Sequence, residues 1–145
     1  MTHGRHIPLS QDAALVVALA GTAIPFAHSA EDEAERWLRA MRLHGQVGST
    51  LQALGVGEAP LMTGSDHAHE EVPHGTPNLG PDVLDDVTER AHHFAMTRQA
   101  DTVGTTDILF AVLDVYGKLF DRALYLRGTS RAELVERLTA AAARG

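Results

Sequence analysis

Three histidines and three acidic residues gather in the stretch SDHAHEEVPH. They are His67, His69 and His74, with Asp66, Glu70 and Glu71. Histidines two positions apart lie on the same side of an extended segment, and with a third they could hold a transition metal. A stretch rich in proline and glycine is a poor preorganised cage. We therefore expect no metal site, and these histidines remain the candidates if the protein binds metal.

Other side chains capable of chemistry lack partners at the required spacing. His92 and His93 are adjacent, so on a helix they point in different directions and do not form the i, i+4 pair of zinc proteases. Gly117-Lys118 lacks the glycine that a phosphate loop carries five residues earlier, because Val112 stands there. No serine has a recognisable nucleophile motif around it, and the absence of cysteine excludes thiol chemistry. We expect no enzyme and no cofactor.

The composition limits the partners. The chain has 145 residues, 44% of them hydrophobic, and a formal net charge of −7 without a concentrated basic face. Such a charge repels phosphate backbones, so we expect no nucleic-acid binding. The longest apolar stretch, AALVVALAGTAI, is too short to span a bilayer and does not fit a secretory signal. We expect no membrane segment and a cytoplasmic location.

The elements that must position any site are helices. Apolar residues at helical spacing predict a first helix after the cap Ser10, ended by Pro25. A second helix follows the cap Ser29, and a short third one ends before Gly55. Residues 57–78 contain three prolines and three glycines without periodicity, which predicts a linker.

The second half follows the same order. Pro81 stands in the first turn of a predicted helix, and Thr105 is expected to cap the next one. Gly117 separates that helix from a short one that ends at Gly128. The sequence SRAE at 130–133 is a capping-box pattern and opens a last helix.

Six pairs of residues agree between the halves at a nearly constant offset. They are Val16/Val87, Ala20/Ala91, Leu38/Leu109, Ala40/Ala111, Gly45/Gly117 and Gly55/Gly128. We interpret them as a tandem repeat of helix, helix and short helix. The predicted fold is all-α, one domain over 1–145 with seven to eight helices in one bundle. Repeat one covers about 9–56 and repeat two about 79–143.

Each half resembles the Clp repeat, the duplicated motif of the N-terminal domains of ClpA- and ClpC-type AAA+ unfoldases. LSQDA from Leu9 is similar to the opening F-T-x-x-A of that motif, and LQALGV from Leu51 to its end. ERWLRAM from Glu35 and VGTTDILFAVL at 103–113 are similar to its central G-T-E-H-[IL]-L-x-[AG]-L. The resemblance covers about residues 9–143. It implies a non-catalytic domain that docks adaptors and substrates.

In ClpC-type members the motif glutamate and a threonine at the first helix start form a phosphoarginine pocket. Carried over to the first half, Glu35 keeps the glutamate and Ser10 keeps a hydroxyl. In the second half, Thr106 replaces the glutamate and Asp107 the histidine. A neutral Thr106 supplies no charge for a guanidinium, so we expect the second pocket not to bind phosphoarginine.

The resemblance implies a groove lined by the helix starts. It would bind a Clp-type adaptor, a substrate peptide, phosphoarginine or a cyclic-peptide ligand, and the protein would regulate an unfoldase or act as a decoy. The candidate binding residues are Leu9, Ser10, Asp12, Ala13, Glu35, Gly80, Val83, Thr105 and Thr106. The alternatives are a metal-binding protein that uses the linker histidines, and a purely structural or oligomerisation module.

Overall fold

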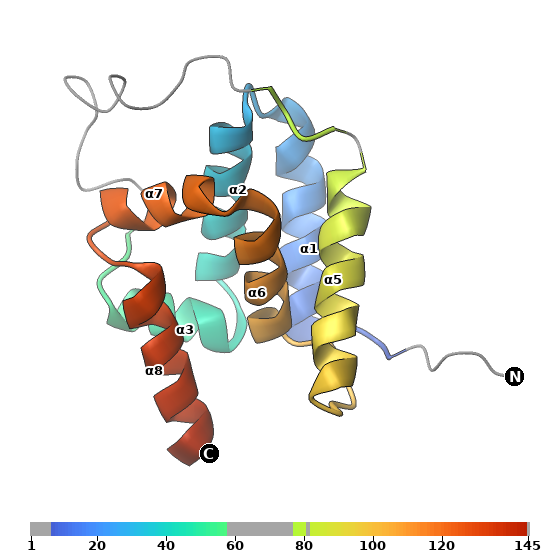
Figure 1. The fold of residues 1–145 in the computed structure, drawn as a ribbon, viewed down its shortest axis with the longest axis vertical. Helices are drawn as coiled ribbons and strands as arrows, with labels where there is room; N and C mark the ends of the chain where they lie inside the picture. Colours follow the sequence, from blue (N-terminus) through green and yellow to red (C-terminus); the bar gives the residue numbers. More distant parts are fainter. Residues whose placement is uncertain (1–6, 58–76, 81, 145) are drawn as a thin grey trace, which may run out of the picture.

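The computed structural model describes residues 7–57, 77–80 and 82–144, and the elements that these residues form are all helices (Figure 1). The elements are α1 (Gln11–Ala23), the short 3-10 helix η1 (Ile24–Phe26), α2 (Ala30–Arg42), α3 (Gly45–Ala53), α5 (Val83–Thr97), α6 (Thr105–Tyr116), α7 (Lys118–Leu126) and α8 (Arg131–Arg144). The prediction of an all-α fold is therefore confirmed.

Three of the four predicted helix caps are confirmed. The hydroxyls of Ser10, Ser29 and Ser130 each accept a hydrogen bond from the third residue of the following helix, at 3.1, 3.2 and 3.1 Å. The prediction for Thr105 is wrong, because Gly104 precedes α6 and Thr105 is its first residue. The Asp107 carboxylate accepts from the Gly104 N–H at 2.9 Å and satisfies that donor. Thr105 is buried instead of capping the helix.

The two halves share one hydrophobic interior. α1 packs against α2 and α5 against α6, while across the halves α2 contacts α7 and α6 contacts α3. Trp37 and Leu38 of α2 and Ile108 and Leu109 of α6 are fully buried in the same cluster. Each such side chain contributes about 1.5–3 kcal/mol by leaving water. Neither half could bury these faces alone.

The six sequence pairs occupy like environments in the two halves. The four aliphatic pairs are all buried, and both members of each glycine pair have positive φ. The values are 73° and 56° for Gly45 and Gly117, and 86° and 85° for Gly55 and Gly128. The halves therefore agree in helix order and in burial at these positions. Their origin as a tandem repeat stays a prediction.

A buried polar network joins the halves beside this core. Glu33 is 1% exposed, and its carboxylate accepts a hydrogen bond from the Tyr116 hydroxyl at 2.8 Å. The Tyr116 oxygen accepts in turn from the Trp37 indole N–H at 3.2 Å. Burial, followed by the hydrogen bond to Glu33, raises the pKa of Tyr116 above its usual value. The phenol therefore stays protonated in the folded protein.

Replacing Tyr116 with phenylalanine tests this network. At pH 7 the variant should lose about 1–3 kcal/mol, because Glu33 loses a buried donor. Because the pKa of Tyr116 is higher in the folded than in the unfolded chain, its phenol stabilises the folded state below the unfolded pKa of about 10. This contribution is lost as the pH rises above that value. Urea unfolding should show the wild type and Y116F converging between pH 9 and 11. The control Y125F alters an exposed phenol. A difference that is constant with pH would contradict the interpretation.

Two glycines of positive φ provide a second test. A Cβ on Gly45 would lie 2.6 Å from the Thr105 hydroxyl, whereas a Cβ on Gly55 would meet open space. G55A should cost about 1–2 kcal/mol of unfolding free energy, the penalty of left-handed backbone. G45A should cost about 1–3 kcal/mol more, because it also overpacks the contact between α3 and α6. Equal losses in urea unfolding would show that Gly45 is not in close contact with Thr105.

Candidate functional site

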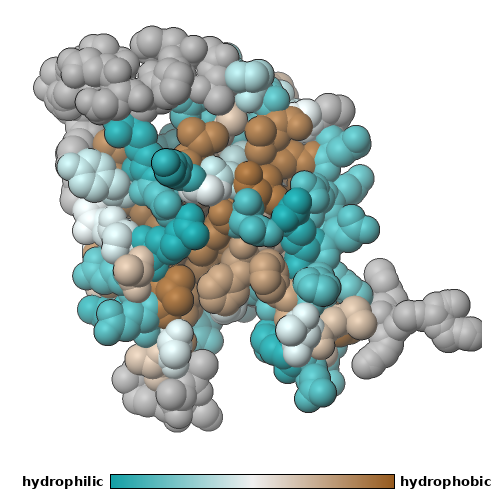
Figure 2. Space-filling view, in the orientation of Figure 1, coloured by the Kyte–Doolittle hydropathy of each residue, from teal (hydrophilic) through white to brown (hydrophobic). Residues whose placement is uncertain are grey.

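A cavity of about 450 Å³ lies where α1, α3 and α6 begin. Its polar lining comes from Ser10, Asp12, Gln46, Arg98, Thr105, Thr106 and Thr139. Phe110 and Leu138 add apolar surface from α6 and α8. Figure 2 shows the face hollowed between the lower end of α8 and the turn from α5 to α6.

Backbone pairing brings the helix starts of the two halves together. The Ser10 N–H donates to the Val103 carbonyl, and the Val103 N–H donates to the Pro8 carbonyl, both at 2.9 Å. This single parallel bridge ties the residues before α1 to those before α6. As a result, the start of the first helix in one half faces the start of the second helix in the other.

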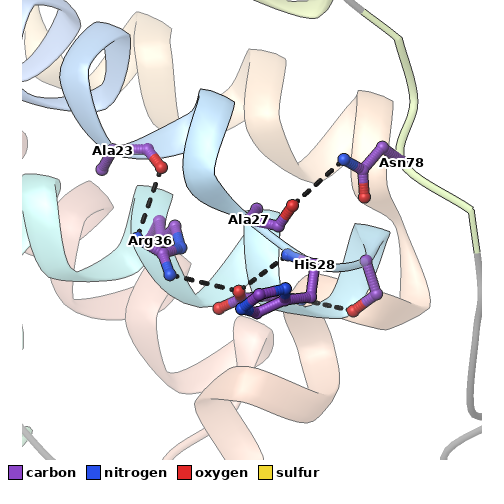
Figure 3. Close-up of polar contacts among 7 residues, drawn as sticks. Ala23, Ala27, His28, Arg36 and Asn78 are labelled. Atoms are coloured by element: carbon purple, nitrogen blue, oxygen red, sulfur yellow. Dashed lines mark hydrogen bonds and ion pairs between the residues drawn. The ribbon is translucent and has the colours of Figure 1, made fainter.

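The reciprocal arrangement occurs at the other end of the bundle. The Asn78 amide donates to the Ala27 carbonyl at 3.1 Å, which Figure 3 shows. The next residue, Leu79, donates its N–H to the buried Glu33 carboxylate at 3.2 Å. The residues before α5 are therefore held against the start of α2.

An ion pair fixes one edge of the cavity. The Asp107 carboxylate is 1% exposed and accepts two hydrogen bonds from the Arg98 guanidinium, at 2.9 and 2.6 Å. These bonds raise the pKa of Arg98. The Arg98 side chain is about half exposed, so part of it stays in contact with solvent. Sequence reasoning missed Arg98, since its partner lies nine residues away in another helix.

The cavity combines groups of both charges. Thr105 and Thr106 are the first residues of α6, where backbone N–H groups lack helical partners and the helix dipole is positive. Asp12 is exposed in the first turn of α1 and brings a carboxylate to the same space. The arrangement can therefore receive an anionic group and a cationic group at once.

Four of the nine predicted binding residues line this cavity, namely Ser10, Asp12, Thr105 and Thr106. Leu9 packs beside them against the core, and Ala13 is completely buried within it. Gly80 and Val83 lie at the start of α5, with Val83 lining a separate hollow between α5 and α6.

The structure does not bring Glu35 to the cavity with Ser10. Its carboxylate pairs with Arg127 at 2.6 Å, and Arg127 is 1% exposed. α2 begins at Ala30, so Glu35 lies in its second turn instead of at the helix start. Glu35 thus neutralises the buried Arg127 guanidinium at the end of α7. The N–H groups that begin α2 lie one turn away from Glu35.

The linker histidines His67, His69 and His74 lie outside the described residues. Within the described parts of the chain, no three histidine, cysteine or acidic residues come close enough to hold a metal ion. His92 has a structural contact, since its Nε2 accepts from the Ile7 N–H at 3.0 Å. None of the helices in those same parts is long and apolar enough to cross a membrane.

Comparisons with known proteins leave the family open. No protein-family model matches the chain, and a search of curated proteins found no match. Any functional conclusion therefore depends on the residues and their geometry.

Replacing Glu35 with glutamine tests its assigned contact. E35Q should lower the unfolding free energy by about 2–3 kcal/mol, because it removes the carboxylate charge that pairs with the buried Arg127 guanidinium. The control E136Q neutralises an exposed carboxylate on α8 and should change stability by less than about 0.5 kcal/mol. Urea unfolding at pH 7 measures both. A loss in E35Q no larger than in E136Q would contradict the structural role.

Proposed function

We propose that the protein is a non-catalytic binding module of the Clp N-terminal type, which takes a peptide, an adaptor segment or a cyclic-peptide-like ligand. The observation that carries this proposal is the cavity between the helix starts of the two halves. Ser10, Asp12, Thr105 and Thr106 were selected from the sequence, and all four line that cavity. Its volume, about 450 Å³, lies in the range of small-ligand sites and fits one or two side chains of a longer ligand.

The lining favours a ligand that carries both charges. An anionic group would accept hydrogen bonds from the Thr106 hydroxyl and the N–H groups that begin α6. A guanidinium or ammonium group would pair with the Asp12 carboxylate across the cavity. Asp12 then supplies the charge that Thr106 lacks, and it comes from the other half of the chain. A phosphoarginine side chain or a zwitterionic peptide end has this combination of groups.

The same binding activity would serve two roles. As a regulator, the module competes with an unfoldase for adaptors; as a decoy, it sequesters cyclic peptides that target such domains. Both roles use the cavity as the ligand site and require no bond-making step. The proposal therefore concerns binding, and affinity is the quantity to measure.

Blocking the cavity tests the proposal directly. Phosphoarginine peptides, their unmodified counterparts, a Clp adaptor and a cyclic peptide would each be titrated by calorimetry. T106R places a bulky cation inside the cavity and should weaken binding at least about tenfold, equivalent to about 1.4 kcal/mol. The control A132R adds the same side chain at an exposed position on α8 and should leave affinity unchanged.

The charge assignment has its own variant. D12N replaces the carboxylate with an amide of nearly the same size. It should therefore weaken the binding of ligands that carry a guanidinium more than the binding of ligands that lack one. No saturable binding of any of the four ligands would overturn the proposed function. Binding that T106R and A132R affect equally would place the site elsewhere and overturn the assignment to this cavity.

A further inference from the structure

A second hollow lies between α1 and α2, away from the cavity. This α1–α2 groove has a volume of about 200 Å³ and is lined by Leu19, Ala23, Arg36, Arg39 and Leu43 among others. Leu19 is 37% exposed and Leu43 is 53% exposed, although both are aliphatic. Large exposed apolar side chains that share one groove are typical of contact surfaces.

Arginines give this groove a positive wall. Arg36 donates to the Ala23 carbonyl and pairs with Asp32, each at 3.3 Å, which holds its guanidinium along the groove (Figure 3). Arg39 is exposed and makes no hydrogen bond or ion pair with any residue that the structure describes. The groove therefore offers a cation that no described residue neutralises, beside apolar surface, in a chain whose net charge is −7.

The corresponding helices of the second half carry an acidic groove. Two adjoining hollows of about 370 and 310 Å³ follow α5 and α6 and share Asp86 and Glu89. Val115 and Phe94 contribute apolar surface to them. We call them together the α5–α6 groove.

The acids of this groove are not all neutralised. Arg90 bridges Asp86 and Asp114, at 3.0 and 2.6 Å. Asp85 and Glu89 are exposed and make no ion pair within the described residues. The α5–α6 groove therefore keeps a negative charge beside its apolar residues, opposite in sign to the α1–α2 groove.

We propose that the α1–α2 groove of one copy docks on the α5–α6 groove of a second copy. Arg39 then faces Glu89 and its acidic neighbours, while Leu19 and Leu43 meet Val115 and Phe94. The two grooves belong to different helices, so in a pair one copy keeps its α5–α6 groove unused and the other keeps its α1–α2 groove unused. Such a heterologous contact joins further copies, into open chains or closed rings, as the concentration rises. The grooves are small, so the contact is of the weak, transient class.

Sedimentation equilibrium of the full chain over about 10 μM to 1 mM tests this contact at one fixed ionic strength. The average mass of the wild type should rise steadily with concentration. R39E and E89K should each weaken association at least about tenfold, since like charges then face each other. The controls R137E and E136K change the net charge by the same amounts at exposed positions on α8 and should associate as the wild type does.

The combined variant R39E/E89K decides whether the two residues meet. It restores opposite charges with the pair reversed, so it should associate within about threefold of the wild type. A wild type that stays monomeric throughout would overturn the proposal. The proposal would also be overturned if R39E and E89K associated as strongly as their α8 controls. A combined variant that associated no more strongly than the single variants would overturn it too. Circular dichroism of every variant identifies any that fail to fold, and L43S then supplies an independent reading of the same groove.

Discussion

The structure depends on two central helices, each of which buries its apolar face against the other half of the chain. α2 supplies Trp37 and Leu38, and α6 supplies Ile108 and Leu109, to one continuous interior. In half of such a bundle these side chains would be exposed to water, at a free-energy cost of about 25 cal/mol for each Å² of apolar surface. The shared core is therefore what sets the helix starts of one half beside those of the other. The cavity exists only because both halves contribute to it.

Buried charges then fix the positions of the connecting segments. Glu33 receives hydrogen bonds from Tyr116 and from the backbone of Leu79, so it ties the residues before α5 to α2 and α6. Arg127, at the end of α7, is neutralised by Glu35 of α2. A buried ion pair adds little net stability, but breaking it is costly, so an arrangement that separates Glu35 from Arg127 is penalised. The polar network in this way selects one register for the two halves.

Local signals in the sequence predicted the helices well, and partners distant in sequence limited the rest. Ser10 and Ser29 cap helices through contacts within three residues, so their roles could be inferred from spacing alone. Thr105 carries the same cap-like signal but is buried, because α3 of the other half packs against it. Arg98 could be recognised only when the fold placed it on Asp107. Motif similarity selected Glu35, yet the Ser29 cap starts α2 earlier than the motif predicts.

That earlier start explains why the two ends of the bundle differ. The offset that relates Leu38 to Leu109 also relates Ala34 to Thr105, which is the first residue of α6. However, α2 begins earlier, at Ala30. α2 thus starts about one turn earlier than α6 does, and Glu33 within that first turn accepts the Leu79 N–H and becomes buried. The start of α6 has no such turn, so its first residues line an open cavity. This asymmetry places the open cavity at the start of α6, even though the helix order is the same in both halves.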